Sequence, residues 1–336
     1  MKLLTVTVPC YNSQDYMEHC VESLLSGGDR VEIIIIDDGS KDRTGEIADR
    51  LMAEHPDVIK VVHQENGGHG EGINAGLRNA TGVYFKTADS DDWLSDDFPQ
   101  FLDDLEACER QGGVDLFVTN YYYDHADGKG NRSINFSNAL PEGRIFGWSE
   151  TKPFRVDQIL MIHACTFRTE MLKKTGLELP KHIFYEDNYM VYGNLPAAER
   201  LYYKNVDLYH YFIGREGQSV QEESMKRRYA QQIKATELCC TVYHLDEIKD
   251  RRKRKYLKHE LFIMLGIAMV STRLNGSEQS EKDYKAMWET YRAYDKKWAD
   301  HFRYRTPLLF FCIPGRFGAA IVRLIYCIAH KVIRFN

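Results

Sequence analysis

The sequence predicts an α/β protein with a doubly wound, mostly parallel sheet and a helical C-terminal extension. Over roughly the first 90 residues, short apolar runs alternate with segments whose apolar residues recur at helical spacing. Each apolar run ends in polar or glycine residues, as the strands of an α/β sheet do. Beyond residue 225, long helical patterns replace this alternation. A chain of 336 residues is long enough for one large domain or two unequal ones.

Four predicted strands and three predicted helices alternate along the first part of the chain. The run 31–36 is apolar apart from Glu32, which is typical of a parallel strand buried on both faces. Ser13 is available to cap the first helix, and a Gly-Gly pair can end it. We expect strands at 3–8, 31–36, 58–63 and 83–86, and helices at 14–26, 44–54 and 73–79.

The composition argues against several classes of function. The net charge is −5, so general attraction to nucleic acid is not expected. The eight cysteines contain no C-x-x-C pair, which argues against a zinc site. No signal-peptide pattern precedes the first strand, so we expect these cysteines to be reduced thiols of a cytosolic protein.

An acidic turn follows the fourth predicted strand. Asp89, Asp91 and Asp92 lie within four positions and repel one another unless a cation lies between them. On extended backbone, residues two apart point the same way, so Asp89 and Asp91 can share one ion. Mg²⁺ and Mn²⁺ prefer such oxygen ligands. Asp92 is expected to face away and cap the next helix, and a capped helix start is also the alternative for the whole turn.

Polar turns follow each of the four predicted strands. Because the carboxyl ends of parallel strands meet at one edge of the sheet, where α/β proteins bind their ligands, we expect these turns to form a single site. The turns are 9–12, 37–40, 63–70 and 89–92.

These motifs, in this order and spacing, resemble those of the family 2 glycosyltransferases, which have the GT-A nucleotide-binding fold. Any one of the motifs alone would be weak evidence, and the resemblance covers about residues 1–220. The matching motifs are Val8–Asn12, Glu32–Thr44, Asn66–Gly68, Asn74–Gly76, Ala80–Gly82 and Asp89–Trp93.

The resemblance implies a nucleotide-sugar site. It implies that Asp38 accepts a hydrogen bond from the uracil edge of a UDP-sugar, the alternative being a turn residue before a glycine. Asp89 is expected to face the ribose or metal-bound water and to share the Mn²⁺ or Mg²⁺ ion with Asp91. Many relatives carry a basic residue where this chain has Ile73. The substitutes for it are Lys86, His69 and Arg78, and the further nucleotide-binding residues are Pro9, Tyr11, Asn66 and Gly68.

A second cluster resembles the E-D motif of the same family. Asp187 would be the general base that takes the proton of an acceptor hydroxyl, with inversion at the sugar carbon. Glu186 would orient the loop or contact the acceptor, and the alternative is that both acids simply begin the helix 188–194. His163, on a predicted strand 161–168, is either an acceptor residue or a satisfied core histidine. Arg215 offers a planar fork suited to the donor diphosphate.

The C-terminal third lies outside the resemblance. We expect a catalytic domain over 1–222, a helical region over 223–305 that includes a helix at 281–302, and a basic tail over 306–336. The basic run 249–255 is expected to be a solvated helix face. The tail has no acidic residue, and its pattern favours an amphipathic helix on an anionic membrane surface or, alternatively, one packed on the protein.

Together these features predict an inverting, metal-dependent glycosyltransferase of the hexosyl or N-acetylhexosaminyl class. It would move a sugar from a nucleotide sugar, expected to be a UDP-sugar, to a hydroxyl of a glycan or lipid-linked acceptor in envelope polysaccharide synthesis. We expect it in the cytoplasm, at the inner face of the plasma membrane. The alternatives are a nucleotidyltransferase of the same fold and a non-catalytic membrane-associated scaffold.

Overall fold

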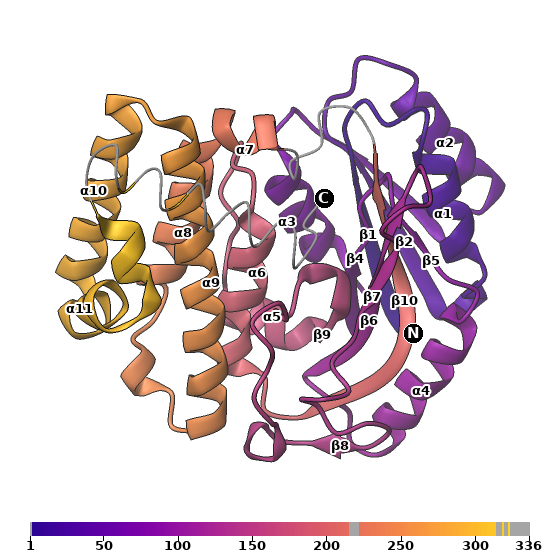
Figure 1. The fold of residues 1–336 in the computed structure, drawn as a ribbon. Coiled ribbons are helices and arrows are strands. Elements are labelled where there is room, and N and C mark those ends of the chain that lie inside the picture. The colour runs from indigo at the N-terminus through magenta and orange to yellow at the C-terminus, as the bar shows by residue number, and fades with distance from the viewer. Residues whose placement is uncertain (1, 215–221, 314–317, 319–321, 323–336) are drawn as a thin grey trace. The chain divides into compact units, whose positions relative to one another are not determined.

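The computed structural model describes residues 2–214, 222–313, 318 and 322, and the chain divides into two compact units (Figure 1). The first unit comprises Met1–Phe154 and Leu160–Gly214. The second comprises Arg155–Ile159 and Arg215–Asn336. The predicted tail at 306–336 lies mostly outside the described residues, as does Arg215.

One sheet organises the first unit, in the order β3-β2-β1-β4-β9-β6-β10-β5. The strands β3, β2, β1 and β4 are mutually parallel, β9 runs antiparallel between β4 and β6, and β6 pairs in parallel with β10. The predicted α/β class and mostly parallel sheet are therefore confirmed. The strands are β1 Leu4–Cys10, β2 Val31–Asp37, β3 Ile59–His63, β4 Tyr84–Thr87, β5 Trp93–Leu94, β6 Leu116–His125, β7 Arg132–Ile134, β8 Ile145–Phe146, β9 Cys165–Arg168 and β10 Leu201–Ile213.

Helices cover both faces of this sheet. In Figure 1, α1, α2 and α4 lie on one face, and α3, α5 and α6 lie on the other. This is the arrangement that right-handed crossovers produce when the strand order runs outward in both directions from β1. The helices are α1 Met17–Leu25, α2 Thr44–Glu54, α3 His69–Asn79, α4 Phe98–Arg110, α5 Thr169–Thr175 and α6 Glu186–Asn194.

Two helix starts differ from the prediction. The first helix begins at Met17, and Ser13 does not cap it, because the Ser13 hydroxyl accepts from the N–H of Tyr11 and contacts Ser90 Oγ at 2.8 Å. The third helix begins four residues early, at His69. Both changes bring polar side chains to the carboxyl edge of the sheet.

Small residues let α3 lie directly on β1. A Cβ atom on Gly76 would stand 2.0 Å from Thr7 Oγ1, far inside van der Waals contact. Glu32, the acid within β2, is buried and accepts hydrogen bonds from Thr5 and Thr81 side chains and from Lys60 Nζ. The acidic break in the apolar run is therefore a paired structural group.

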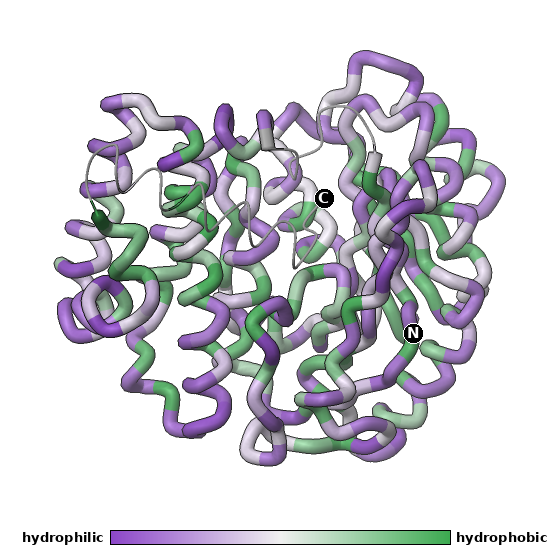
Figure 2. The backbone as a smooth tube through the Cα atoms, viewed as in Figure 1, coloured by the Kyte–Doolittle hydropathy of each residue, from purple (hydrophilic) through white to green (hydrophobic). Residues whose placement is uncertain are grey.

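The second unit is helical, which confirms the predicted extension. The predicted helix 281–302 is in fact two helices, because the chain breaks at Asp295, whose side chain accepts from the N–H of Trp298 and starts α11. Hydrophilic and hydrophobic turns alternate along these helices (Figure 2), as expected of helices that bury one face. No helix in the described ranges is long and apolar enough to cross a membrane. The helices are α7 Glu222–Arg227, α8 Tyr229–Thr241, α9 Arg251–Asn275, α10 Glu278–Tyr294 and α11 Lys296–Arg305.

Candidate active site

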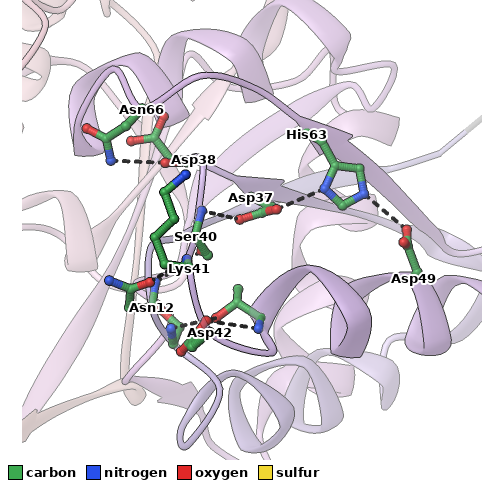
Figure 3. A network of polar contacts seen from close by, with 11 residues as sticks. Asn12, Asp37, Asp38, Ser40, Lys41, Asp42, Asp49, His63 and Asn66 are labelled. Carbon is green, nitrogen blue, oxygen red and sulfur yellow. Dashed lines mark hydrogen bonds and ion pairs between the residues drawn. The ribbon is translucent and has the colours of Figure 1, made fainter.

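The turns that follow β1 and β2 interlock at the carboxyl edge of the sheet (Figure 3). Asn12 Oδ1 accepts from the N–H of Lys41 at 2.8 Å, and the N–H of Asn12 donates to Ser40 Oγ at 3.1 Å. Asn12 has a φ of 50°, a conformation that few non-glycine residues adopt. Beside it, the side chain of Tyr11 is half exposed and available to a ligand, whereas Pro9 lies buried within β1.

Asp37 ties the ends of β2 and β3 together. Its carboxylate accepts from the N–H of Ser40 at 3.0 Å and contacts His63 Nδ1 at 2.9 Å. His63 Nε2 in turn lies 3.1 Å from Asp49. Although desolvation opposes it, hydrogen bonding by Ser40 and His63 lowers the pKa of Asp37. Asp37 is therefore an ionised structural group at the edge of the site (Figure 3).

Asp38 holds the loop that follows β3. Its carboxylate accepts from the N–H groups of Gly67 and Gly68, both at 2.8 Å, and from Gln64 Nε2 at 2.8 Å. Asn66 Nδ2 donates to the Asp38 carbonyl oxygen at 2.9 Å. Asp38 is buried, and three of its roughly four acceptor sites are taken, which leaves about one for a ring N–H.

The glycines of this loop allow it to pack against the segment before α6. Gly68 has a φ of 85°, and a Cβ atom there would stand 2.9 Å from the backbone nitrogen of His182. A Cβ atom on Gly70 would stand 2.9 Å from Glu186 Cγ. His182 and Tyr185 have φ values of 56° and 69°. Together with Asn12 they are the only described non-glycine residues with a positive φ. Strained backbone therefore gathers at this one edge, as it does at functional sites.

Hydrogen bonds from β10 hold the acidic turn that follows β4. Tyr209 accepts from the N–H of Asp89 at 3.0 Å and donates its hydroxyl to Asp92 Oδ2 at 2.6 Å. The N–H of Phe212 donates to Asp92 Oδ1 at 2.8 Å. The expected cap role of Asp92 is wrong, because its buried side chain serves β10 and Asp97 occupies the N-cap position of α4.

The acidic turn has the donor chemistry of a divalent-cation site. Desolvation and the negative charges of Asp91 and Asp89 raise the pKa of Asp92 well above its usual value, a strain that a cation would relieve. Ligand atoms of Asp89, Asp92 and His163 lie within 4.8 Å of one another. Both oxygens of Asp92 already accept hydrogen bonds, and Asp89 Oδ1 contacts His69 Nε2. A metal ion shared by Asp89 and Asp91 stays a prediction from the sequence.

His163 and Lys86 lie buried beneath this turn. The His163 ring stacks between Tyr209 and Tyr211, with both ring centroids at 4.7 Å, and desolvation lowers its pKa to about 4. His163 is therefore a core residue, but it is not the satisfied core histidine of the alternative, because its buried Nδ1 has no hydrogen-bond partner among the described residues. Lys86 Nζ donates to the carbonyl oxygen of His163 at 2.7 Å and is 1% exposed. Lys86 is therefore no substitute for a basic contact to nucleotide, and Arg78 instead pairs with Glu71.

His69 joins the acidic turn to the E-D motif. Its Nε2 lies 3.0 Å from Asp89 Oδ1, and its Nδ1 lies 2.7 Å from Oε1 of the buried Glu186. Although desolvation acts the other way, the charge and hydrogen bonds of these two carboxylates raise the pKa of His69 well above its usual value. The sequence marked His69 only as a possible contact to phosphate and gave no signal for this bridge.

Asp187 begins α6 beside this bridge and is partly exposed. Its Oδ1 accepts from Asn188 Nδ2 at 3.1 Å. Desolvation and the neighbouring charge of Glu186 raise the pKa of Asp187 to about 7, although His69 acts to lower it. A carboxylate with this pKa is a far stronger base at neutral pH than a free aspartate, which is what general-base catalysis needs.

Comparison with known proteins agrees with this architecture. Residues 5–171 match the model of glycosyl transferase family 2. The glycosyltransferase GlyG of Streptococcus pneumoniae is 38% identical over 130 residues, which cover 38% of this chain and 42% of GlyG. The chain therefore spans less than half the length of that relative.

Three solved structures share the fold. TarS of S. aureus aligns with a TM-score of 0.70 at 18% identity, over 97% of this chain and 55% of TarS. A shorter form of TarS in complex with UDP-GlcNAc aligns with a TM-score of 0.55 at 19% identity, over 87% of this chain and 92% of that form. A mannosyltransferase from Pyrobaculum calidifontis in complex with GDP-Man and Mn²⁺ aligns with a TM-score of 0.53 at 16% identity, over 96% of this chain and 86% of the other.

Proposed function

This chain belongs to glycosyl transferase family 2 through its first unit, and we propose that it is an inverting, metal-dependent enzyme that moves a sugar from a UDP-sugar to an acceptor hydroxyl. The proposed class is hexosyl or N-acetylhexosaminyl transfer. We propose the domain limits expected above: a catalytic domain over 1–222, a helical region over 223–305 and a basic tail over 306–336.

The bridge from Asp89 through His69 to Glu186 carries this proposal. It links the acidic turn, which suits a metal and a diphosphate, to the residue preceding the proposed base. Asp89 and Glu186 are 97 residues apart in sequence, so the fold alone brings donor chemistry and base chemistry to one edge. A non-catalytic scaffold has no need of a base with a raised pKa beside a metal site.

Transfer is a single displacement. The acceptor oxygen attacks the anomeric carbon of the sugar, Asp187 takes the proton from that oxygen, and the bond between the anomeric carbon and the diphosphate oxygen breaks. Attack from the face opposite the leaving group inverts the configuration. Glu186, held by His69, fixes the start of α6 and with it the position of Asp187.

The residues that would hold the metal ion, Mn²⁺ or Mg²⁺, are Asp89 and Asp91. When bound, such an ion neutralises charge that develops on the departing diphosphate. His69 has a role in this region as well, because it holds Asp89 at the edge of the turn. The Mn²⁺-bound mannosyltransferase of the same fold supports a divalent cation here.

The proposed donor pocket is made of the first three polar turns. Tyr11 offers an exposed ring beside the buried Pro9, and Asp38 keeps about one acceptor site for the N–H of a uracil ring. Asn66 and Gly68 shape the loop that Asp38 holds. The TarS complex with UDP-GlcNAc supports a UDP-sugar, and Arg215, outside the described residues, is proposed for the diphosphate.

The proposed acceptor is a glycan or lipid-linked hydroxyl compound of the cell envelope, met at the cytoplasmic face of the membrane. This setting is proposed from the resemblance of the sequence motifs, and the relationship to the glycosyltransferase GlyG supports sugar transfer. Of the two roles expected for Glu186, orienting the loop is the one we propose, because Glu186 is 2% exposed and held by His69. His163 is not carried forward as one, because its ring is buried between two tyrosines.

The test is a screen of nucleotide sugars with the full chain and Mn²⁺. We expect UDP-sugars to raise the melting temperature and to release UDP slowly by hydrolysis, because a bound donor stabilises the folded state by mass action. If a GDP-sugar stabilises the protein and is hydrolysed while UDP-sugars are not, uracil is the wrong nucleobase. If no nucleotide sugar stabilises the protein or is hydrolysed, the proposed transfer is wrong.

A further inference from the structure

A cavity of about 690 Å³ lies in the second unit, at the amino-terminal end of α9. Its walls come from three separate segments: the turn that contains Asp246, the first two turns of α9, and the start of α11. Trp298 on α11 provides an aromatic wall. The basic run keeps exposed side chains at Arg251, Arg252 and Lys255, as expected of a solvated helix face, and these side chains also line a concave site.

The charges around this cavity do not balance. Six cations line it against one carboxylate, Asp246, and that carboxylate already contacts Lys297 Nζ at 2.6 Å. Arg254 donates to the carbonyl oxygen of Ile248. Within the described ranges no carboxylate pairs with the remaining cations, which are Arg251, Arg252, Lys255 and Lys258.

The surroundings of these cations add to the positive potential. The start of α9 directs the positive end of its helix dipole toward the same place, although Asp250 caps the first N–H groups. Lys258 Nζ lies 4.3 Å from the Trp298 ring centroid, a cation–π contact that leaves its charge uncancelled. Desolvation and the charges of Arg254 and Lys297 lower the pKa of Lys258, although the charge of Asp246 acts to raise it.

We propose that this cavity is a binding site for a phosphate-bearing anion with two or more negative charges. Arginine forks match the paired oxygens of phosphate, and lysines add point charges that suit the same group. Four cations that have no carboxylate partner in the described part of the chain call for more than one negative charge. Two kinds of ligand carry the phosphate or diphosphate group that such a site would bind: a free phosphate compound and the head group of an anionic phospholipid. The inference does not depend on the proposed glycosyl transfer.

The first arm of the test measures pyrophosphate binding to the full chain by calorimetry, at low salt and with EDTA. The double variant Arg251→Gln/Lys255→Gln should weaken binding at least about tenfold, since losing even one hydrogen bond between charged groups lowers affinity by about that factor. Both side chains are exposed, so the fold should tolerate the change. The matched control is Lys282→Gln/Lys285→Gln, which removes the same charge from the exposed side of α10 and should change affinity less than about twofold.

The second arm separates the two sources. The same variants are sedimented with vesicles of phosphatidylcholine, with and without phosphatidylglycerol. If the cavity variant alone loses binding to the anionic vesicles, the head group is the source, and if only pyrophosphate affinity falls, the source is a free phosphate compound. Equal affinity of the cavity variant and its control for both probes overturns the proposal. Citrate binding as tight as pyrophosphate binding would also overturn the proposal, because the cavity would then not distinguish phosphate from carboxylate groups.

Discussion

Each of the two units has a cluster of like charges, negative in the first unit and positive in the second. The two clusters differ in whether their charged side chains have partners. At the carboxyl edge of the sheet, acids come together and the protein satisfies them: Asp38 accepts from loop amides, Asp92 from Tyr209 and Phe212, and Asp89 contacts His69. In the cavity at the start of α9, cations come together, and within the described residues most have no carboxylate partner.

The two regions therefore differ in how far their side chains are fixed before a ligand binds. Partners already present fix the acids in place, so the first site is preorganised and its ligand needs to bring only charge and shape. The cations lie on long side chains, and a ligand must order them when it binds, which costs side-chain entropy. We therefore expect substitutions in the first region to act mainly on chemistry, and substitutions in the second to act mainly on binding.

The largest effect is expected from Asp187→Asn. This change removes the proposed base and keeps nearly the same shape, so the rate of transfer should fall about 10³-fold, within the usual range for general-base catalysis. Donor affinity, measured by calorimetry with UDP and Mn²⁺, should stay the same. Turnover near that of the unaltered protein would exclude Asp187 as the base.

A stability measurement serves as the control for that variant. Burial raises the folded-state pKa of Asp187 above that of a free aspartate, so its stabilising contribution is present at low pH and is lost as the pH rises through about 7. Asp187→Asn should therefore melt no lower than the unaltered protein at pH 8. A clear drop in melting temperature at that pH would mean that lost activity reflects damage to the fold.

The next largest effect is expected from Asp91→Ala in the acidic turn. Loss of one of two metal-ligating carboxylates should weaken Mn²⁺-dependent UDP binding about 10- to 100-fold, the range seen when groups that support a metal site are removed. Asp96→Ala is the matched control, because Asp96 is an exposed carboxylate five residues away. Similar UDP affinity in both variants, measured by calorimetry, would disprove the metal assignment.

The pH dependence of transfer gives a third measurement. Since the pKa of Asp187 is raised to about 7, its ionised fraction falls tenfold for each pH unit below that value. We expect kcat/KM to be level above about pH 8 and about a hundredfold lower at pH 5. The residual activity of Asp187→Asn should lack this slope. A flat profile in the unaltered protein from pH 5 to 8 would argue against a general base with this pKa.

A smaller effect on stability is expected from Tyr209→Phe. The change removes the hydroxyl that joins Asp89 to Asp92 and should cost about 1–3 kcal/mol of unfolding free energy, because buried polar groups lose a partner. Tyr122→Phe on β6 is the control, since no hydrogen bond of its hydroxyl is found among the described residues. Equal denaturation midpoints for the two variants would show that the anchor contributes nothing.

Much of the first half of the fold could be predicted because its signals are local. The apolar run of β2 and the periodicity of α2 lie in single stretches of sequence, and both elements form as expected. The insertion of β9 between β4 and β6 could not be predicted, because antiparallel pairing across such distances leaves no local pattern. The break at Asp295 was missed for a similar reason, since one capping residue interrupts a continuous helical pattern.

The site shows the same limit. The acidic turn and the E-D motif were recognisable because each is a short run of acids, but the connection between them was not. His69 finds its partners 20 and 117 positions away, and Asp92 is satisfied by Tyr209, 117 positions away. The exposed helix face at 249–255 could be predicted, but the cavity that it lines could not, because Trp298 and Lys297, which complete that cavity, lie on another helix.

The smallest effect is expected on binding at one region when a residue of the other region is substituted. The cavity variant Arg251→Gln/Lys255→Gln should change UDP affinity in the presence of Mn²⁺ by less than about twofold, because among the described residues none of the proposed donor site lines the cavity. Asp91→Ala should in turn leave pyrophosphate affinity in EDTA unchanged. If either substitution moves the binding constant of the other region by more than about tenfold, the two regions are coupled, since linkage makes such an effect reciprocal.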